Sequence, residues 1–135
     1  MVFRFPGLFL LLIVLSACSE PAYHNLDNSQ LKSLLKQNVP IYDIRRPDEW
    51  RQTGVVSGSR LLTFVDPNGR IKADFLERFS AAVDKDDPVI LICRTGSRTS
   101  ALARLLAEKM GFTQVYNVRH GISQWIRDGQ PITRL

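Results

Sequence analysis

Cysteine is scarce in this chain, and no internal repeat or low-complexity segment is present. Two cysteines in 135 residues cannot make a disulfide scaffold. Hydrophobic residues form 44% of the chain and charged residues 23%, which is typical of one globular domain and excludes a disordered, collagen-like or multi-span membrane protein.

Acidic residues are outnumbered by basic ones. Eighteen Lys and Arg against thirteen Asp and Glu give a formal net charge of +5 and a pI of about 9.6. This balance allows small anions, acidic lipid or nucleic acid as partners, so the choice must come from the positions of residues rather than from composition.

The first five residues carry one positive charge, Arg4, and an uncharged apolar stretch follows from Gly7 to Ala17. This pattern predicts a secretory signal peptide. As a helix, the stretch would span roughly 17 Å, well short of the roughly 30 Å hydrocarbon core of a bilayer. A permanent transmembrane helix is therefore the poorer interpretation.

The stretch ends in Leu15-Ser16-Ala17-Cys18, which resembles the lipobox of bacterial lipoproteins. The resemblance implies a signal peptide over residues 1–17, a lipid on Cys18 that anchors the protein to the membrane, and a polar tether over residues 18–28. Ser19, rather than Asp, follows the cysteine, which in such lipoproteins favours the outer membrane. The alternative is an ordinary signal peptide with an incidental cysteine.

A lipoprotein that faces the periplasm meets no chromosomal DNA, so we expect no nucleic acid partner. The basic charge then favours small anions or acidic lipid headgroups. With Cys18 lipidated, Cys93 is the one remaining thiol, in a compartment that promotes disulfides.

Helical and strand patterns alternate along residues 29–135. Apolar residues at helical spacing or proline and acids in a first turn predict helices, and short apolar runs predict strands. The expected helices are 30–37, one that starts at 47–50, 74–83, 100–110 and 122–127, and the expected strands are 39–44, 60–65, 89–92 and 115–118. The alternation predicts a single α/β domain with a mostly parallel sheet and helices on both faces.

Cys93 directly follows four aliphatic residues, Val89 to Ile92, that predict a strand buried on both faces. Ligands of such sheets bind beyond the carboxyl ends of the strands. A tight loop and a helix N-terminus after the strand would surround the sulfur with backbone N–H groups, which favours the thiolate. The alternative is a buried cysteine that acts as a small hydrophobic residue.

The loop after Cys93 carries residues suited to hold an anion. Gly96 permits a tight backbone turn, and Arg94 and Arg98 add positive charge and forked hydrogen-bond donors. The candidate substrate-binding residues are Arg94, Thr95, Gly96, Ser97, Arg98 and Thr99. We expect an activated sulfur nucleophile that a donor can reach and that these backbone amides face.

The chain at this point resembles the rhodanese-like domain family of sulfurtransferases. Cys93, Gly96 and Arg98 match the signature C-x-x-G-x-R. The segment 41–50 is similar to the family's first block, and 115–131 to its closing block. Together these matches span about 31 to 132, nearly the whole predicted domain.

The resemblance implies sulfur transfer through a persulfide on Cys93. The donor would be thiosulfate or a related persulfide or polysulfide, and the acceptor would be cyanide or a thiol. No metal or organic cofactor is implied. Asp43, Arg45 and Glu49 would be structural residues near the site, with direct contact to substrate as the alternative.

His120 replaces one of two adjacent glycines that are common in the family before Trp125. Its imidazole would bind an anion or shuttle a proton at the mouth of the site, or would simply be exposed in a turn. Where the family often has a histidine in a turn, this chain has the segment 54–58 without one, so the role of that histidine does not transfer.

Two other functions fit part of the pattern. A cysteine-dependent phosphatase or arsenate reductase also has an oxyanion loop between a strand and a helix, but such loops place arginine at the sixth position after the cysteine, where this chain has Thr99. A non-catalytic binding module is the other alternative, and the presence of Cys93, Gly96 and both arginines argues against it.

Overall fold

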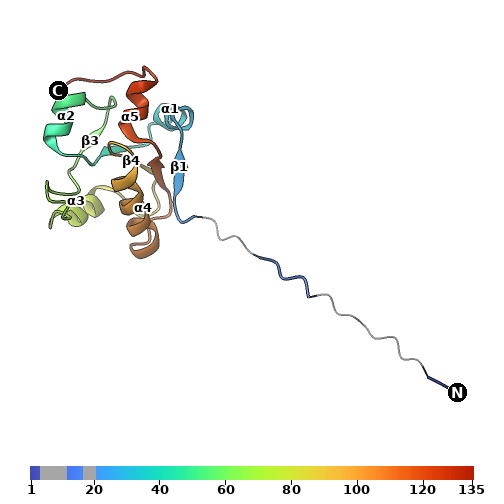
Figure 1. The fold of residues 1–135 in the computed structure, drawn as a ribbon. Helices are drawn as coiled ribbons and strands as arrows, with labels where there is room; N and C mark the ends of the chain where they lie inside the picture. The colour runs from blue at the N-terminus through green and yellow to red at the C-terminus, as the bar shows by residue number, and fades with distance from the viewer. Residues whose placement is uncertain (4–11, 17–20) are drawn as a thin grey trace.

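The computed structural model describes residues 1–3, 12–16 and 21–135 (Figure 1). Its sheet holds five strands in the order β1-β5-β4-β2-β3, and every neighbouring pair is parallel. The strands are β1 (His24–Leu26), β2 (Ile41–Asp43), β3 (Arg60–Leu61), β4 (Val89–Ile92) and β5 (Val115–Val118). The predicted single α/β domain with a parallel sheet is confirmed.

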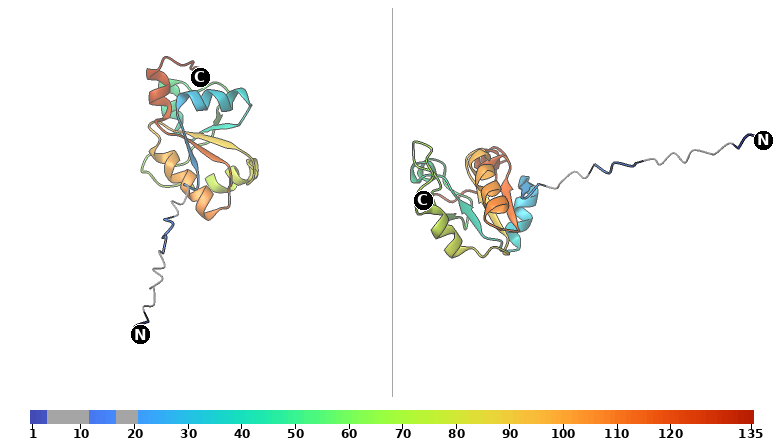
Figure 2. Two further views of the ribbon diagram at one scale, coloured as in Figure 1. Left: turned by 90° about the vertical axis from the view of Figure 1, so that its right-hand side faces the viewer. Right: turned by 90° about the horizontal axis from the view of Figure 1, so that it is seen from below.

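Helices cover both faces of the sheet, as Figure 2 shows. The helices are α1 (Asn28–Lys36), α2 (Pro47–Thr53), α3 (Phe75–Ala82), α4 (Ser97–Lys109) and α5 (Gly121–Arg127). One core cluster joins α3 and α4 to one face, and a second joins α1 and α5 to the other. Between them lies β4, whose four residues are all buried, as its unbroken apolar run predicts.

The first strand differs from the prediction. The sequence assigns residues 18–28 to a tether, yet β1 pairs with β5 along His24 to Leu26, and Asp27 caps α1. The tether prediction is therefore wrong for residues 24–28. Three residues with no apolar alternation carry no strand signal, and their place in the sheet depends on pairing with β5.

The predicted limits differ most from the structure for two elements. The helix expected over 100–110 begins at Ser97, directly after the loop glycine, because the polar residues 97–99 form its first turn. The strand expected over 60–65 contains only Arg60 and Leu61. Beyond it the chain stays beside β2, since Leu62 N–H donates to Asp43 O at 3.2 Å.

Candidate active site

Cys93 lies at the C-terminal end of the central strand β4, at the edge of the sheet predicted for ligand binding. The backbone N–H of Gly96 donates to its Sγ at 3.2 Å, and the Thr99 hydroxyl lies 3.3 Å from Sγ. Gly96 has a φ of +96°, which turns the chain into α4 at once. The sulfur therefore lies against the first turn of α4, with one backbone amide rather than a ring of amides directed at it.

The sulfur is less accessible than the sequence predicts. Only 1% of the surface of Cys93 is exposed, and the side chain belongs to the core cluster under α4. Thr99, predicted as a substrate-binding residue, is also fully buried. The expectation of an open thiolate is wrong for this conformation, because β4 directs the side chain toward α4, and a donor reaches Sγ only if the loop or the side chain moves.

The N-terminus of α5 forms hydrogen bonds to the loop that begins at Cys93. Ile122 N–H donates to the Cys93 carbonyl at 2.9 Å, and Ser123 N–H donates to the Arg94 carbonyl at 3.1 Å. Gly121, with a φ of +62°, lies so close to the Arg94 carbonyl that a Cβ there would overlap it. Loop carbonyls thus face α5, which leaves the Gly96 amide free to face the sulfur.

Arg98 is paired rather than open to substrate. Its two terminal nitrogens donate to the two carboxylate oxygens of Glu49 at 2.8 and 2.7 Å, which joins α4 to α2. The sequence predicts that Arg98 binds substrate, and in this structure its two terminal nitrogens are instead bonded to Glu49. An arginine fork and a carboxylate in this bidentate geometry form a strong, charge-assisted pair.

This pairing shifts the pKa of both groups. Burial alone would raise the pKa of Glu49, but hydrogen bonds and positive charge from Arg98 and Arg46 outweigh it and lower the pKa to about 2. The hydrogen bonds that Arg98 donates to the Glu49 carboxylate in turn raise the pKa of Arg98 above its ordinary value. Both groups are charged across the physiological pH range.

Asp43 and Arg45 form a buried pair at the end of β2. The Arg45 guanidinium donates to Asp43 from Nε at 3.0 Å and from Nη2 at 2.8 Å, and Trp50 Nε1 donates to the same carboxylate at 3.0 Å. Arg45 also donates to the Gly54 carbonyl at 3.0 Å. These contacts join β2 to the middle and to the C-terminal end of α2, which agrees with the structural role that the sequence predicts for both residues.

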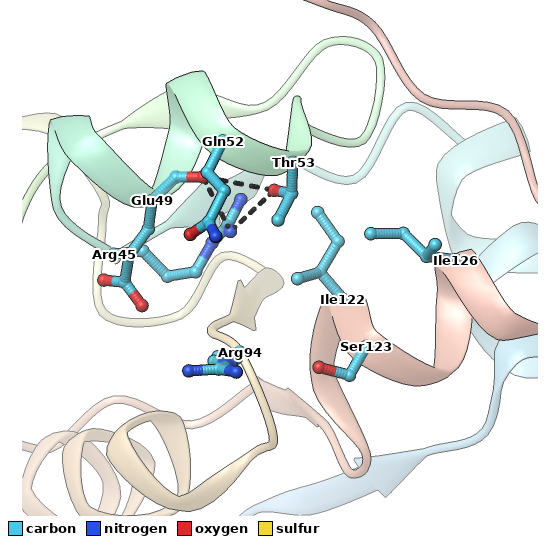
Figure 3. Close-up of a pocket in the computed structure, with 8 residues that line it drawn as sticks. All are labelled: Arg45, Glu49, Gln52, Thr53, Arg94, Ile122, Ser123 and Ile126. Atoms are coloured by element: carbon cyan, nitrogen blue, oxygen red, sulfur yellow. Dashed lines mark hydrogen bonds between the residues drawn. The ribbon is translucent and has the colours of Figure 1, made fainter.

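A cleft of about 260 Å³ lies between α2 and α5 (Figure 3). Gln52 and Thr53 line it from α2, and Ile122 and Ile126 face them from α5. Arg94 lines it from the loop that follows β4. Glu49 and Arg45 also border this cleft, but Arg45 is fully buried and Glu49 is only 8% exposed.

A second hollow, of about 640 Å³, lies over the loop and is strongly polar. Its lining residues are Arg94, Thr95, Ser97, Arg98, His120, Ser123 and Arg127. It shares Arg94 and Ser123 with the cleft, so the two spaces adjoin. His120 is exposed and lines this hollow, which places it at the predicted mouth.

The sequence matches the rhodanese-like domain family over residues 27–128. The chain belongs to that family. A relative in Arabidopsis thaliana, named thiosulfate sulfurtransferase 18, is 31% identical over 114 residues, which cover 80% of this chain and 82% of that protein.

Two solved structures resemble the rhodanese-like domain described here. The polysulfide-sulfur transferase homodimer of Wolinella succinogenes has a TM-score of 0.66 at 20% identity, over 84% of this chain and 80% of that one. A Rhodopseudomonas palustris protein, described as a possible tyrosine phosphatase, has a TM-score of 0.60 at 27% identity, over 83% of this chain and 86% of that one.

The rhodanese-like site includes residues that sequence reasoning missed. Ser123 and Arg127 lie four residues apart on α5, so they share one face of that helix and both line the hollow. Neither belongs to the C-x-x-G-x-R signature, and an arginine near the end of a helix is usually a solvated residue. The turn between β5 and α5 brings them to the site.

Some predictions concern residues outside the described part of the chain. Cys18 and parts of the predicted signal peptide, residues 4–11 and 17, fall there. Among the described residues, no helix has both the length and the apolar character needed to cross a bilayer. The described residues also contain no group of three or more His, Cys, Asp or Glu side chains placed to hold a metal ion.

Proposed function

We propose that this rhodanese-like domain is a sulfurtransferase that carries sulfane sulfur as a persulfide on Cys93. The observation that carries the proposal is the Gly96 N–H at 3.2 Å from Sγ, with the Thr99 hydroxyl at 3.3 Å, beside the N-terminus of α4. Donors directed at sulfur beside a helix N-terminus stabilise a thiolate or a persulfide anion. The name of the Arabidopsis relative supports thiosulfate as one donor.

The proposed reaction has two steps. The Cys93 thiolate attacks the outer sulfur of thiosulfate, an S–S bond forms to Cys93, and the S–S bond of thiosulfate breaks to release sulfite with its electron pair. A thiolate or cyanide then attacks the outer sulfur of the persulfide and regenerates the Cys93 thiolate. A persulfide or polysulfide donor would react in the same way, and no metal or organic cofactor is needed for either step.

Mass spectrometry of peptides from the protein after incubation with thiosulfate tests this function. We expect the Cys93 peptide to gain one sulfur atom, which cyanide removes, and we expect Cys93→Ser to gain none. The burial of Cys93 is the observation against the proposal, so absence of the mass gain with thiosulfate, polysulfide and a low-molecular-weight persulfide would refute it.

The phosphatase alternative predicts a different result, namely hydrolysis of an aryl phosphate that depends on Cys93 without any gain of sulfur. This alternative is tested because the Rhodopseudomonas palustris protein of similar structure is described as a possible tyrosine phosphatase. The pairing of Arg98 with Glu49 counts against it, because the fifth-position guanidinium is not free to grip a phosphate ester. A non-catalytic module would show neither the mass gain nor the hydrolysis.

We also propose that residues 1–17 are a signal peptide and that Cys18 carries a lipid that anchors the protein on the periplasmic side, at the outer membrane. The lipobox-like segment 15–18 supports this proposal. In a bacterial host, radiolabelled palmitate should enter the full chain but not Cys18→Ala, and the wild type should sediment with outer-membrane fragments. Equal labelling of both chains would refute the lipid site.

A further inference from the structure

The hollow over the catalytic loop has more free positive charge, and more room, than a small sulfur oxyanion needs. Arg94 and Arg127 both line it, and neither forms an ion pair within the described residues. No Asp or Glu is among the described residues that line it. Its volume of about 640 Å³ falls within the range of pockets that bind drug-sized ligands.

The two free guanidiniums come from different elements. Arg94 belongs to the loop after β4, whereas Arg127 is the last residue of α5. Gln124 Oε1 accepts a hydrogen bond from Arg127 Nη2 at 2.7 Å, and Gln124 Nε2 donates to Asp128 at 2.6 Å. These bonds hold the Arg127 guanidinium in place while its remaining N–H groups stay available to a ligand.

Hydroxyl groups complete the lining. Ser97 and Thr95 contribute from the loop side, and Ser123 contributes from the same face of α5 as Arg127. Arginine forks with neighbouring hydroxyls recognise carboxylates by paired, charge-assisted hydrogen bonds. Two arginines on separate elements can each pair with a different anionic group of one ligand.

We propose that the sulfur-bearing partner of this site is a small thiol, or its persulfide, that carries two carboxylates, and that Arg127 is the residue that selects it. This inference rests on the proposed sulfurtransferase function. As donor, the persulfide anion gives its outer sulfur to the Cys93 thiolate, the S–S bond of the donor breaks, and the dicarboxylate thiolate leaves. As acceptor, the dicarboxylate thiolate takes the outer sulfur from the Cys93 persulfide in the reverse direction.

Binding of unreactive thioethers tests the inference without turnover. The probes are the S-methyl ethers of mercaptosuccinate, 3-mercaptopropionate and 2-mercaptoethanol, which carry two, one and no carboxylates, and calorimetry gives each Kd for the full chain. For the wild type we expect the dicarboxylate to bind at least about tenfold tighter than the neutral ether, as expected for charge-assisted hydrogen bonds. This preference should weaken at high salt.

Two variants test whether Arg127 is responsible for the preference for the dicarboxylate. Arg127→Gln should reduce the preference for the dicarboxylate about tenfold, because one charged contact is lost. Arg104→Gln, which removes the same charge from an exposed position of α4 outside the hollow, should keep the wild-type preference. Equal binding of all three ethers by the wild type, or the same loss in both variants, would overturn the inference.

The reactive thiols supply the second readout. The outer sulfur of the Cys93 persulfide should transfer to mercaptosuccinate faster than to 2-mercaptoethanol in the wild type. The ratio of these two rates should fall in Arg127→Gln. If no persulfide forms on Cys93 with any donor, the sulfurtransferase function fails, while the thioether affinities still decide whether Arg127 selects dicarboxylates. If persulfide forms but the ratio is the same in both proteins, only the inference about Arg127 fails.

Discussion

The Thr99 hydroxyl has one proton and two neighbours that can accept it. It lies 3.3 Å from Cys93 Sγ and 3.2 Å from the Gly96 carbonyl, and it is fully buried. With a protonated thiol, the S–H can donate to Thr99 while Thr99 donates to the carbonyl. With a thiolate, the hydroxyl can turn and donate to sulfur, so Thr99 is placed to support both charge states.

Thr99→Val should therefore slow the alkylation of Cys93 by iodoacetamide at neutral pH. We expect about a tenfold decrease, because a hydrogen bond to a charged group contributes about 1.5 kcal/mol or more. Thr99→Ser, which keeps the hydroxyl, is the control and should react within about twofold of the wild type. Equal rates for Val and Ser would show that the hydroxyl does not support the thiolate.

Glu49 stabilises the fold through Arg98. The pair is partly buried, so removing the carboxylate charge in Glu49→Gln should lower the free energy of unfolding by about 1–3 kcal/mol, between the values typical of exposed and buried pairs. Asp74→Asn breaks the exposed Arg78 to Asp74 pair and should change stability by less than about 0.5 kcal/mol. Urea denaturation at neutral pH gives both values.

The same pair predicts a dependence of stability on pH. The pKa of Glu49 falls from its ordinary value of 4.5 to about 2 on folding, so its stabilisation is present above about pH 4.5 and is lost as the pH falls toward 2. In urea denaturation, the difference in free energy of unfolding between the wild type and Glu49→Gln should become smaller over this pH range. A gap that stays constant from pH 6 to pH 2.5 would contradict the lowered pKa.

At the scale of elements, α5 supports the loop that follows Cys93. Backbone N–H groups in its first turn donate hydrogen bonds to the carbonyls of Cys93 and Arg94, and Gly121 allows the close approach that these bonds need. The helix also brings Ser123 and Arg127 to the hollow. Distortion at its start is thus expected to affect both the geometry of the loop and the lining of the site.

Gly121→Ala should destabilise the protein more than Gly129→Ala does. Both glycines have positive φ, +62° and +68°, so each alanine has a backbone cost of about 1–2 kcal/mol. Only at Gly121 would the added Cβ overlap the loop backbone, whereas nothing lies within 4 Å at Gly129. Thermal unfolding compares the two variants, and equal losses would show that the loop absorbs the added methyl group without strain.

A comparison of the expected and observed helices and strands shows where a local sequence pattern is enough to predict an element. The strands over 89–92 and 115–118 have the predicted limits, and for 89–92 the unbroken aliphatic run is itself a local signal. The start of α4 at Ser97 and the strand β1 were missed. A polar first turn and a short edge strand depend on the loop glycine and on the neighbouring strand rather than on their own side chains.

At the scale of the whole molecule, β1 ties the beginning of the domain to its end. Tyr23 and Leu26 are buried, 9% and 5% exposed, and the Tyr23 hydroxyl lies 2.7 Å from Ser100 Oγ on α4. The strand itself pairs with β5, more than ninety residues along the chain. The folded unit therefore includes residues that the sequence assigns to the tether.

A chain that begins at residue 29 should consequently be less stable than one that begins at residue 21. Loss of two buried side chains and one strand pairing is expected to lower the free energy of unfolding by at least about 3 kcal/mol. Urea denaturation of the two truncated chains measures the difference. Equal stability would place the true start of the domain at residue 29, as the sequence alone predicts.

The sequence by itself determined the α/β class, the family signature around Cys93 and the basic loop after it, because these depend on residues close together in the chain. Only the tertiary structure decided that Cys93 is buried, that Arg98 is paired with Glu49, and that Arg127 lines the hollow. Each of these depends on contacts between residues far apart in sequence, which form only when α2, α4 and α5 pack around the carboxyl ends of the strands.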